Sequence, residues 1–402
     1  MRVALATLFA VLLAPDPTLA ESRRIVAVGD IHGAYDAFRA ILLEAEIVDE
    51  EENWAGGEAV LVQTGDFLDR GAESIRVARW LMELQQQAPA KGGRVIVLLG
   101  NHESMNLMGD LRFVPPEMLE PMVGKESVKR LARMCRVRAT ILRQSARVMN
   151  QKAAPASALR ERCMKEHAPG MVEYQESLRP GQPLGDWLRS LPALARVDGT
   201  VFVHGGISPE LEPREVEEIN RRVREELERF ESWRRFLAEA GRMPESATLV
   251  EMARAVQVEL AVEEQEAERK DGALPDIGDG DPDLAEFFEL SDSLQLSQTG
   301  PLWYRGYDSW TYEEGLEELP EILESLEAER IVVGHTPQNP RRIRCRFGGR
   351  VFLIDTGMLA EYYKGVPAAL EIRDGRVEAI YLHERVAFLG EGAGETAGDE
   401  CR

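Results

Sequence analysis

Runs of hydrophobic residues alternate with amphipathic stretches in the first and last parts of the chain. Short β-branched runs predict strands at residues 25–28, 59–63, 94–99, 200–203, 330–333 and 351–354. Apolar residues at helical spacing predict helices at 34–46 and 74–87. Strands that alternate with helices indicate an α/β architecture, in which functional groups gather beyond the carboxyl ends of the strands.

Two long segments interrupt this alternation. Residues 111–195 carry Arg, Met and Ala at helical spacing, and the pattern predicts helices at 128–149 and 159–166 and a turn or helix at 184–191. Residues 210–290 are strongly charged and predict helical structure from 212 to 270, either as a solvated hairpin or as a lid that frames a substrate. We therefore expect one domain over residues 21–385 with two helical insertions, followed by a flexible tail over 386–402.

The first 20 residues have the pattern of a secretory signal peptide. Arg2 provides a positive start, residues 3–14 are apolar, and the small residue Ala20 ends a cleavage motif. The apolar run is shorter than the ~20 residues that a membrane span needs, and no later segment is apolar for long enough. We expect cleavage and a periplasmic or secreted protein; the alternatives are an N-terminal membrane anchor and a buried first strand.

Charge and cysteine content narrow the classes of function. The chain has 70 acidic and 48 basic residues, a net charge of −22, which argues against a nucleic-acid partner. The four cysteines are Cys135, Cys163, Cys345 and Cys401, and without a CxxC pair they do not indicate a zinc or thioredoxin-like motif. Cys135 and Cys163 flank a helical stretch, where a disulfide and two buried thiols both fit the pattern.

Side chains that bind metals gather at the predicted strand ends. Four of the six histidines and three further residues lie there: Asp30, His32, Asp66, Asn101, His102, His204 and His335. Nitrogen and oxygen ligands of this kind suit manganese, iron or zinc. Two cations ~3.5–4 Å apart would activate a bridging hydroxide and stabilise an in-line displacement at phosphorus.

The spacing of these residues suggests how the ligands divide between two ions. Asp66, in the central motif, is the natural bridging carboxylate, and Asp30 and His32 can face one ion from an extended turn. The second ion would then be completed by three further residues: Asn101, His204 and His335.

Three neighbouring residues provide the remaining chemistry. Arg70 offers a planar fork of donors for phosphate oxygens. Asp69 can orient His102, so that the imidazole protonates the leaving group.

The motifs GDIHG (29–33), GDFLDRG (65–71) and GNHE (100–103) resemble the signature of the phosphoprotein phosphatases, a family of calcineurin-like metallophosphoesterases. NHESMNLMGDLRFV (101–114) and PLWYRGY (301–307) resemble the Shewanella-like branch of that family. The resemblance implies a central β-sandwich flanked by helices, the metal roles given above, His102 as the acid, and phosphate binding by Arg70 and Arg305. A structural arginine among neighbouring aromatic rings is the alternative for Arg305.

The resemblance predicts a dinuclear-metal phosphatase that acts on phosphomonoesters, on proteins, peptides or small molecules. The late motif is GHT, without a second histidine, and HGG replaces a longer loop, so the choice between tyrosine and serine or threonine stays open. A dinucleoside polyphosphate hydrolase is the alternative enzyme, since that group shares the three opening motifs. A secreted, non-catalytic metal-binding module is the third hypothesis, but it would need neither the acid nor the arginines.

Overall fold

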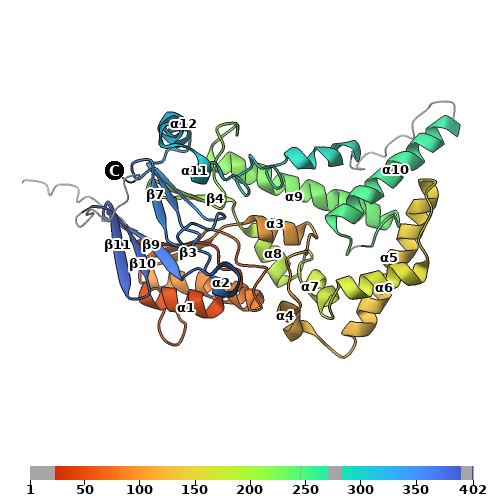
Figure 1. The fold of residues 1–402 in the computed structure, drawn as a ribbon, viewed down its shortest axis with the longest axis horizontal. Coiled ribbons are helices and arrows are strands. Elements are labelled where there is room, and N and C mark those ends of the chain that lie inside the picture. Colours follow the sequence, from red (N-terminus) through yellow and green to blue (C-terminus); the bar gives the residue numbers. More distant parts are fainter. Residues whose placement is uncertain (1–22, 245, 270–282, 391–400, 402) are drawn as a thin grey trace, which may run out of the picture.

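Two β-sheets form one end of the molecule in the computed structural model, which describes residues 23–244, 246–269, 283–390 and 401 (Figure 1). The strands are β1 (Ile25–Val28), β2 (Val60–Gln63), β3 (Arg94–Val97), β4 (Leu194–Val197), β5 (Thr200–Val203), β6 (Arg330–Val333), β7 (Arg344–Arg346), β8 (Val351–Leu353), β9 (Ala368–Arg373), β10 (Arg376–Tyr381) and β11 (Glu384–Leu389). Their orders are β11-β10-β9-β1-β2-β3 and β4-β5-β6-β8-β7. The predicted signal peptide lies outside the described residues.

Each sheet contains three parallel strands, which form one side of the first sheet and the centre of the second, and its remaining strands are antiparallel. β1, β2 and β3 run parallel, as do β5, β6 and β8. Side chains alternate between the faces of a strand, so one face of each sheet packs against the other. Ala27 and Val62 of the first sheet share a buried cluster with Phe202 and Phe352 of the second. The predicted sandwich is therefore present.

Helices cover the sandwich and extend beyond it. They are α1 (Tyr35–Glu44), α2 (Ser74–Gln87), α3 (Asn101–Leu107), α4 (Pro116–Leu119), α5 (Ser127–Val148), α6 (Ala156–Glu166), α7 (Met171–Ser177), α8 (Pro183–Ser190), α9 (Val216–Glu239), α10 (Leu249–Arg269), α11 (Gly306–Ser309), α12 (Tyr312–Ser325) and α13 (Ala360–Tyr363), with short 3-10 turns η1 (Ala88–Lys91), η2 (Glu120–Met122) and η3 (Ala285–Asp292). Phe38 of α1 and Leu81 of α2 pack with Val26 and Leu61 on the outer face of the first sheet. In the described part of the chain, no helix combines the length and apolar character that crossing a membrane requires.

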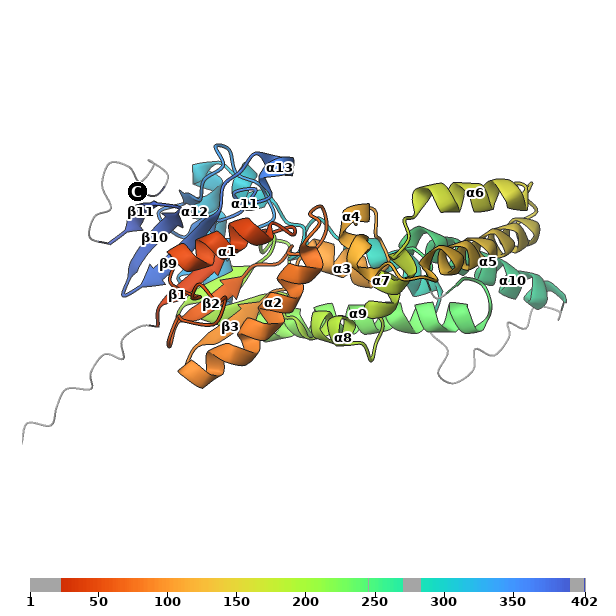
Figure 2. The same ribbon diagram turned by 90° about the horizontal axis from the view of Figure 1, so that it is seen from below.

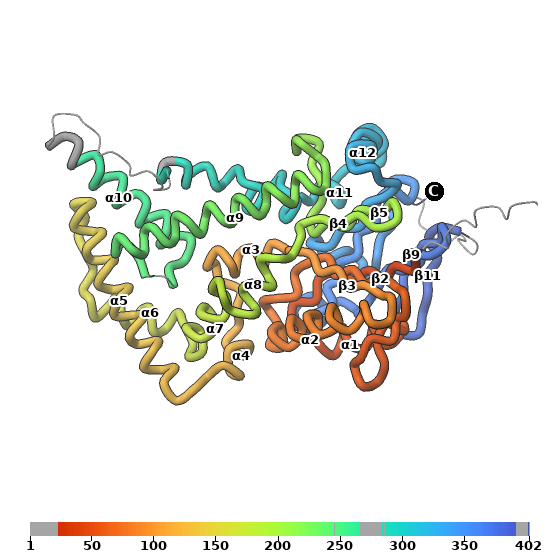
Figure 3. Tube along the Cα trace, turned by 180° about the vertical axis from the view of Figure 1, so that it is seen from behind, coloured from red at the N-terminus to blue at the C-terminus, as the bar shows by residue number. Residues whose placement is uncertain are grey.

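The two insertions form a helical arm, which we define as α5, α6, α9 and α10. Seen from below, this arm projects away from the sandwich (Figure 2). Seen from behind, α9 runs from the sandwich into the arm, and α5 and α10 extend beyond it (Figure 3). A disulfide between Cys135 of α5 and Cys163 of α6 joins two of its helices, which settles that open question in favour of the disulfide.

The last strand of the first sheet extends beyond residue 385, where the sequence predicts the end of the domain. β11 continues to Leu389 because it pairs antiparallel with β10, a contact between segments that the composition of the tail does not reveal. Cys401 is buried and bonded to Cys345 of β7. The rest of the predicted tail, residues 391–400 and 402, lies outside the described residues.

Candidate active site

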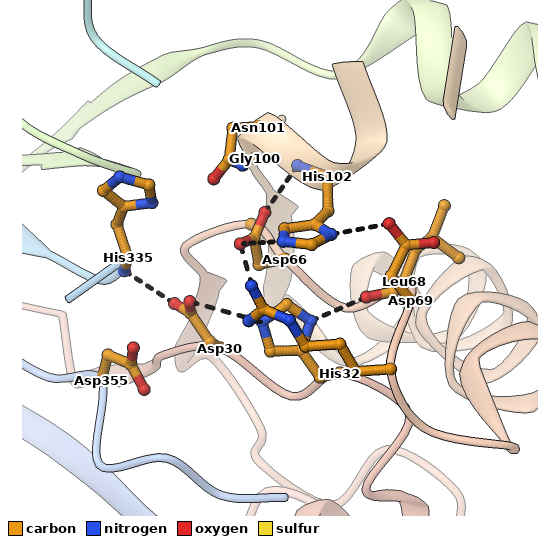
Figure 4. A network of polar contacts seen from close by, with 12 residues as sticks. Asp30, His32, Asp66, Leu68, Asp69, Gly100, Asn101, His102, His335 and Asp355 are labelled. Carbon is orange, nitrogen blue, oxygen red and sulfur yellow. Dashed lines mark hydrogen bonds and ion pairs between the residues drawn. The ribbon is translucent and has the colours of Figure 1, made fainter. Parts of the chain in front are cut away.

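The predicted ligands converge at the carboxyl ends of the parallel strands (Figure 4). Asp30 and His32 follow β1, Asp66 follows β2, Asn101 and His102 begin α3 after β3, His204 follows β5, and His335 follows β6. All seven side chains are buried. Parallel strands end at one edge of a sheet, so residues that are far apart in sequence meet there.

Asp66 lies at the centre of this cluster. Its Oδ2 atom is 3.3 Å from Nε2 of His204 and 3.7 Å from Nε2 of His32. Two groups of side chains have ligand atoms within 4.8 Å of one another, one made of His32, Asp66 and His102 and the other of Asp66, His204 and His335. Asp66 is common to both groups, the position that a bridging carboxylate requires.

The other three predicted ligands close the cluster. Nε2 of His204 is 2.9 Å from Oδ1 of Asn101 and 3.0 Å from Nδ1 of His335. The backbone N–H of His335 donates to Oδ1 of Asp30 at 2.9 Å. The structure thus brings all six predicted ligands together.

The backbone of the cluster is strained at five non-glycine residues. Their φ angles are positive: His32 (46°), Asp66 (58°), Asp69 (65°), Arg70 (65°) and His335 (66°). Side chains disfavour this left-handed region, at a cost on the order of 1–3 kcal/mol each. Such strain persists only where surrounding contacts enforce it, and it gathers at functional sites.

Glu103 provides contacts that hold this strained backbone in place, and the sequence interpretation did not single it out. Its buried carboxylate accepts backbone N–H groups from Asp66 (2.8 Å), Phe67 (3.1 Å), Leu68 (2.9 Å) and Gly100 (3.0 Å). Burial and then the charge of Asp66 raise the pKa of Glu103 to about 7. Its place as the last residue of GNHE was the available signal.

Two glycines permit the close approach of these loops. A Cβ atom at Gly334 would lie 2.5 Å from Oδ1 of Asp30, and one at Gly100 would overlap Asp66. A larger residue at either position would displace the neighbouring carboxylate from the cluster.

His102 and Asp69 form a buried pair beside the cluster. Nδ1 of His102 is 2.6 Å from Oδ2 of Asp69, while Nε2 faces Asp66. Burial lowers the pKa of His102, but the charges of Asp66 and Asp69 outweigh burial and leave the pKa raised. Asn106 donates to Oδ1 of Asp69 at 3.0 Å and accepts a hydrogen bond from Tyr174 of α7 at 2.7 Å.

Asp355, which follows β8, is the other residue that the sequence interpretation missed. The strand end was predicted but the carboxylate was not assigned to the site. Burial raises the pKa of Asp355 to about 6, with a further contribution from Asp66. Burial and then Asp355 raise the pKa of Asp30 well above its ordinary value. Figure 4 shows Asp355 beside Asp30.

The donors of this cluster fit bound cations. Three buried carboxylates (Asp30, Asp66 and Asp355) lie close enough to affect one another's pKa. Burial and then His204 lower the pKa of His335 well below its ordinary value, which leaves a neutral ring. Nε2 of His335 and Oδ2 of Asp355 are buried and make no hydrogen bond to any described residue. Buried carboxylates and unpaired donor atoms of this kind are stabilised by metal ions.

A cavity of about 340 Å³ opens over the cluster and receives both predicted phosphate ligands. Nη1 of Arg70 is 2.6 Å from Nε2 of His32, and its guanidinium lies over the ring of Tyr363. Arg305 donates to the His335 carbonyl at 3.1 Å and to the Thr336 hydroxyl at 2.9 Å. Both arginines can therefore reach an oxyanion in the cavity.

Comparison with known proteins agrees with this geometry. The sequence pattern of the calcineurin-like phosphoesterases matches residues 23–339. Shewanella-like protein phosphatase 1 of Plasmodium berghei is 25% identical over 367 residues, 89% of this chain and 74% of that protein. Shewanella-like protein phosphatase 2 of Arabidopsis thaliana is 31% identical over 212 residues, 52% of this chain and 53% of the relative.

A solved structure shares the fold as well. A mutant of a cold-active protein tyrosine phosphatase superposes with a TM-score of 0.56 and 25% identity, over 91% of this chain and 80% of that one. The predicted α/β fold and the enzyme class, a metal-dependent phosphoester hydrolase, are confirmed. The chain belongs to the calcineurin-like phosphoesterase family, in its Shewanella-like branch.

Proposed function

We propose that the protein is a phosphatase that hydrolyses phosphomonoesters on proteins or peptides and uses His102 as its general acid. The observation that carries this proposal is the buried pair in which Asp69 lies 2.6 Å from Nδ1 of His102. Asp69 holds the ring with Nε2 toward the cavity, and Asn106 fixes Asp69 in turn. Nε2 then donates its proton to the leaving oxygen.

Six side chains would hold two cations, manganese or iron with zinc as the alternative: Asp30, His32, Asp66, Asn101, His204 and His335. When bound, such ions supply an activated water and neutralise charge on the transferred phosphoryl group. Asp355 lies beside the cluster, and its carboxylate would balance their positive charge.

The charges in the cavity favour a phosphomonoester over a dinucleoside polyphosphate. Among the described residues, its arginines are Arg70, Arg112 and Arg305, and Arg112 is paired with Asp110 at 2.6 Å. Two arginines remain for the substrate, which suits one phosphoryl group rather than a chain of several.

The cavity walls favour an aromatic leaving group. Their apolar residues are Met105, Phe113, Leu249, Leu296 and Trp303. Such a wall packs well against a phosphotyrosine ring. Two relatives and the similar structure are named protein phosphatases, and the similar structure is that of a protein tyrosine phosphatase.

A substrate panel tests the proposal. The purified chain, reconstituted with Mn²⁺, is assayed on phosphotyrosine and phosphoserine peptides and on diadenosine tetraphosphate. We expect a higher kcat/KM on the peptides, with tyrosine at least equal to serine. A preference for the dinucleotide at the same metal and salt concentrations would overturn the proposed substrate class. It would not change the assignment of the active-site residues.

We also propose that the protein is exported, as the N-terminal sequence predicts. The disulfides Cys135–Cys163 and Cys345–Cys401 support this, since such bonds persist mainly in oxidising compartments. Mass spectrometry of the protein from its native host should find a mature N-terminus at Glu21. An intact Met1 in the cytoplasmic fraction would refute export.

A further inference from the structure

A second and larger cavity lies between the sandwich and the helical arm. Its volume is about 600 Å³, against about 340 Å³ for the catalytic cavity. It is bordered by α3, α9 and the segment from α7 to α8, which meet in this part of the molecule (Figure 1). The two cavities use different residues of α3, since Asn106 and Leu107 line this one and Met105 lines the other.

Positive charge gathers in this second cavity. Four arginines line it: Arg179, Arg189, Arg234 and Arg235. Of its two carboxylates, Glu231 is paired with Arg189 at 2.8 Å, and Glu239 is exposed. The lining is thus cationic in a chain whose net charge is −22. A concave surface of one charge attracts ligands of the opposite charge.

Arg234 is a half-buried cation that forms no ion pair with a described residue, although the charge of Glu231 acts on it and partly offsets the effect of burial on its pKa. Its Nη1 donates to the carbonyl of Leu107, the last residue of α3, at 2.9 Å. Its Nε and Nη2 atoms are buried and make no hydrogen bond to any described residue. Burial lowers the pKa of Arg234 to about 10, which reflects the cost of holding this charge away from water. An anion in the adjoining cavity would offset that cost.

The rest of the lining is apolar. It includes Leu107, Leu111, Leu178, Ala238 and Met243. Ligand cavities of about 300–1,000 Å³, with apolar walls and a few polar groups, bind small organic molecules. The lining therefore suits a molecule that carries one anionic group on an apolar body.

We propose that this cavity is a second ligand site, which binds a small amphipathic anion such as a carboxylate or phosphate with an apolar chain. The exposed Arg235 and the half-buried Arg234 attract the anionic group, and the leucines receive the chain. The ligand would contact Asn106, which donates to the catalytic-site carboxylate of Asp69 at 3.0 Å. The site is independent of the proposed substrate.

Fluorescence titration of the full chain with 8-anilinonaphthalene-1-sulfonate, which joins a sulfonate to aromatic rings, tests the site. Arg235 is exposed, so Arg235→Glu reverses a rim charge without disturbing a core contact. We expect its Kd for the probe to rise about tenfold or more, the loss of one charge-assisted contact. Arg224→Glu is the matched control, because Arg224 is an exposed arginine of α9 outside the cavity lining.

Competition identifies the ligand class. Octanoate carries both an anion and an apolar chain, so it should displace the probe and raise the Tm of the wild type and of Arg224→Glu, but not of Arg235→Glu. Inorganic phosphate lacks the chain and should displace the probe far less well. The site is overturned if the probe does not saturate, or if Arg235→Glu and Arg224→Glu bind it equally. Equal displacement by phosphate would overturn the amphipathic class.

Discussion

The sandwich end and the helical arm hold their shapes by different means. At the sandwich end, buried polar side chains fix a strained backbone, as at Asp66 and His335 with φ angles of 58° and 66°. In the arm, regular helices carry surface ion pairs such as Arg162–Glu166 at 2.7 Å, and a disulfide joins α5 to α6. Surface pairs of this kind contribute only about 0.3–0.5 kcal/mol each.

This difference indicates that the two regions have different roles. At the sandwich end, a strained and therefore less stable backbone holds the charged side chains of the active site in place, whereas the helices of the arm pack without such strain. Substitutions at the sandwich end should therefore change catalysis first, and substitutions in the arm should change stability first.

Asp66→Asn should have the largest effect and tests whether the sandwich end controls catalysis. Asp66 is common to both groups of ligands, so its loss should release metal and reduce turnover together, by at least about 10³-fold. Elemental analysis beside an assay with p-nitrophenyl phosphate measures both. Glu228→Gln, an exposed carboxylate of α9, is the control and should retain metal and activity. Full metal content with full activity in Asp66→Asn would remove this residue from the site.

His102→Asn should separate proton transfer from metal binding. We expect the variant to keep its metals and to lose roughly 10²–10⁴-fold in turnover, the usual contribution of a general acid. The loss should be larger for alkyl phosphates, whose leaving oxygen needs a proton, than for p-nitrophenyl phosphate. Equal losses on both substrates would contradict the acid role and favour a positioning role instead.

The local part of the site was predictable because it is encoded in short motifs at strand ends. GDIHG, GDFLDRG and GNHE place their ligands directly after β1, β2 and β3, and a hydrophobic run followed by Gly and Asp signals such a turn without tertiary knowledge. The strands predicted at 25–28, 200–203 and 330–333 have the bounds that the structure shows.

The remainder depends on contacts between distant segments. Glu103 matters because four backbone N–H groups from two loops converge on it. The GNHE motif marks this residue but does not show those contacts. β9, β10 and β11 were missed because antiparallel pairing stabilises them more than their own composition indicates: β9 pairs with β1, β10 with β9, and β11 with β10. The arginine-lined cavity is formed by three segments that are distant in sequence. For that reason the sequence alone does not distinguish Arg179 and Arg234 from other surface arginines.

Cys163→Ser tests the arm. The disulfide closes a loop with a sequence separation of 28 residues, and opening it should cost about 3–4 kcal/mol of unfolding free energy. Hydrogen exchange should quicken in α5 and α6, while turnover should stay near the wild-type value. Cys345→Ser opens the other disulfide and is the matched comparison, with faster exchange at β7 instead. A loss of turnover in Cys163→Ser larger than in His102→Asn would break the separation between the two regions.

The smallest effect concerns His167, which follows α6 in the first insertion. Nδ1 of His167 is 2.9 Å from the Cys163 carbonyl and Nε2 is 2.7 Å from Arg138, so the neutral ring is the form that fits. Burial and then the charge of Arg138 lower the pKa of His167 from its ordinary value of 6.5. Below that value the unfolded chain binds a proton that the folded protein does not. This contribution to stability is therefore present above pH 6.5 and is lost as the pH falls toward the folded-state pKa.

Urea unfolding at about pH 7.5 and about pH 5.5 measures this linkage. His167→Gln should lose less unfolding free energy between the two pH values than the wild type does, because its side chain cannot take up a proton. The same slope in His167→Gln and in the wild type would contradict this assignment. Unchanged turnover per folded molecule would keep the effect within the arm, as the comparison of the two regions requires.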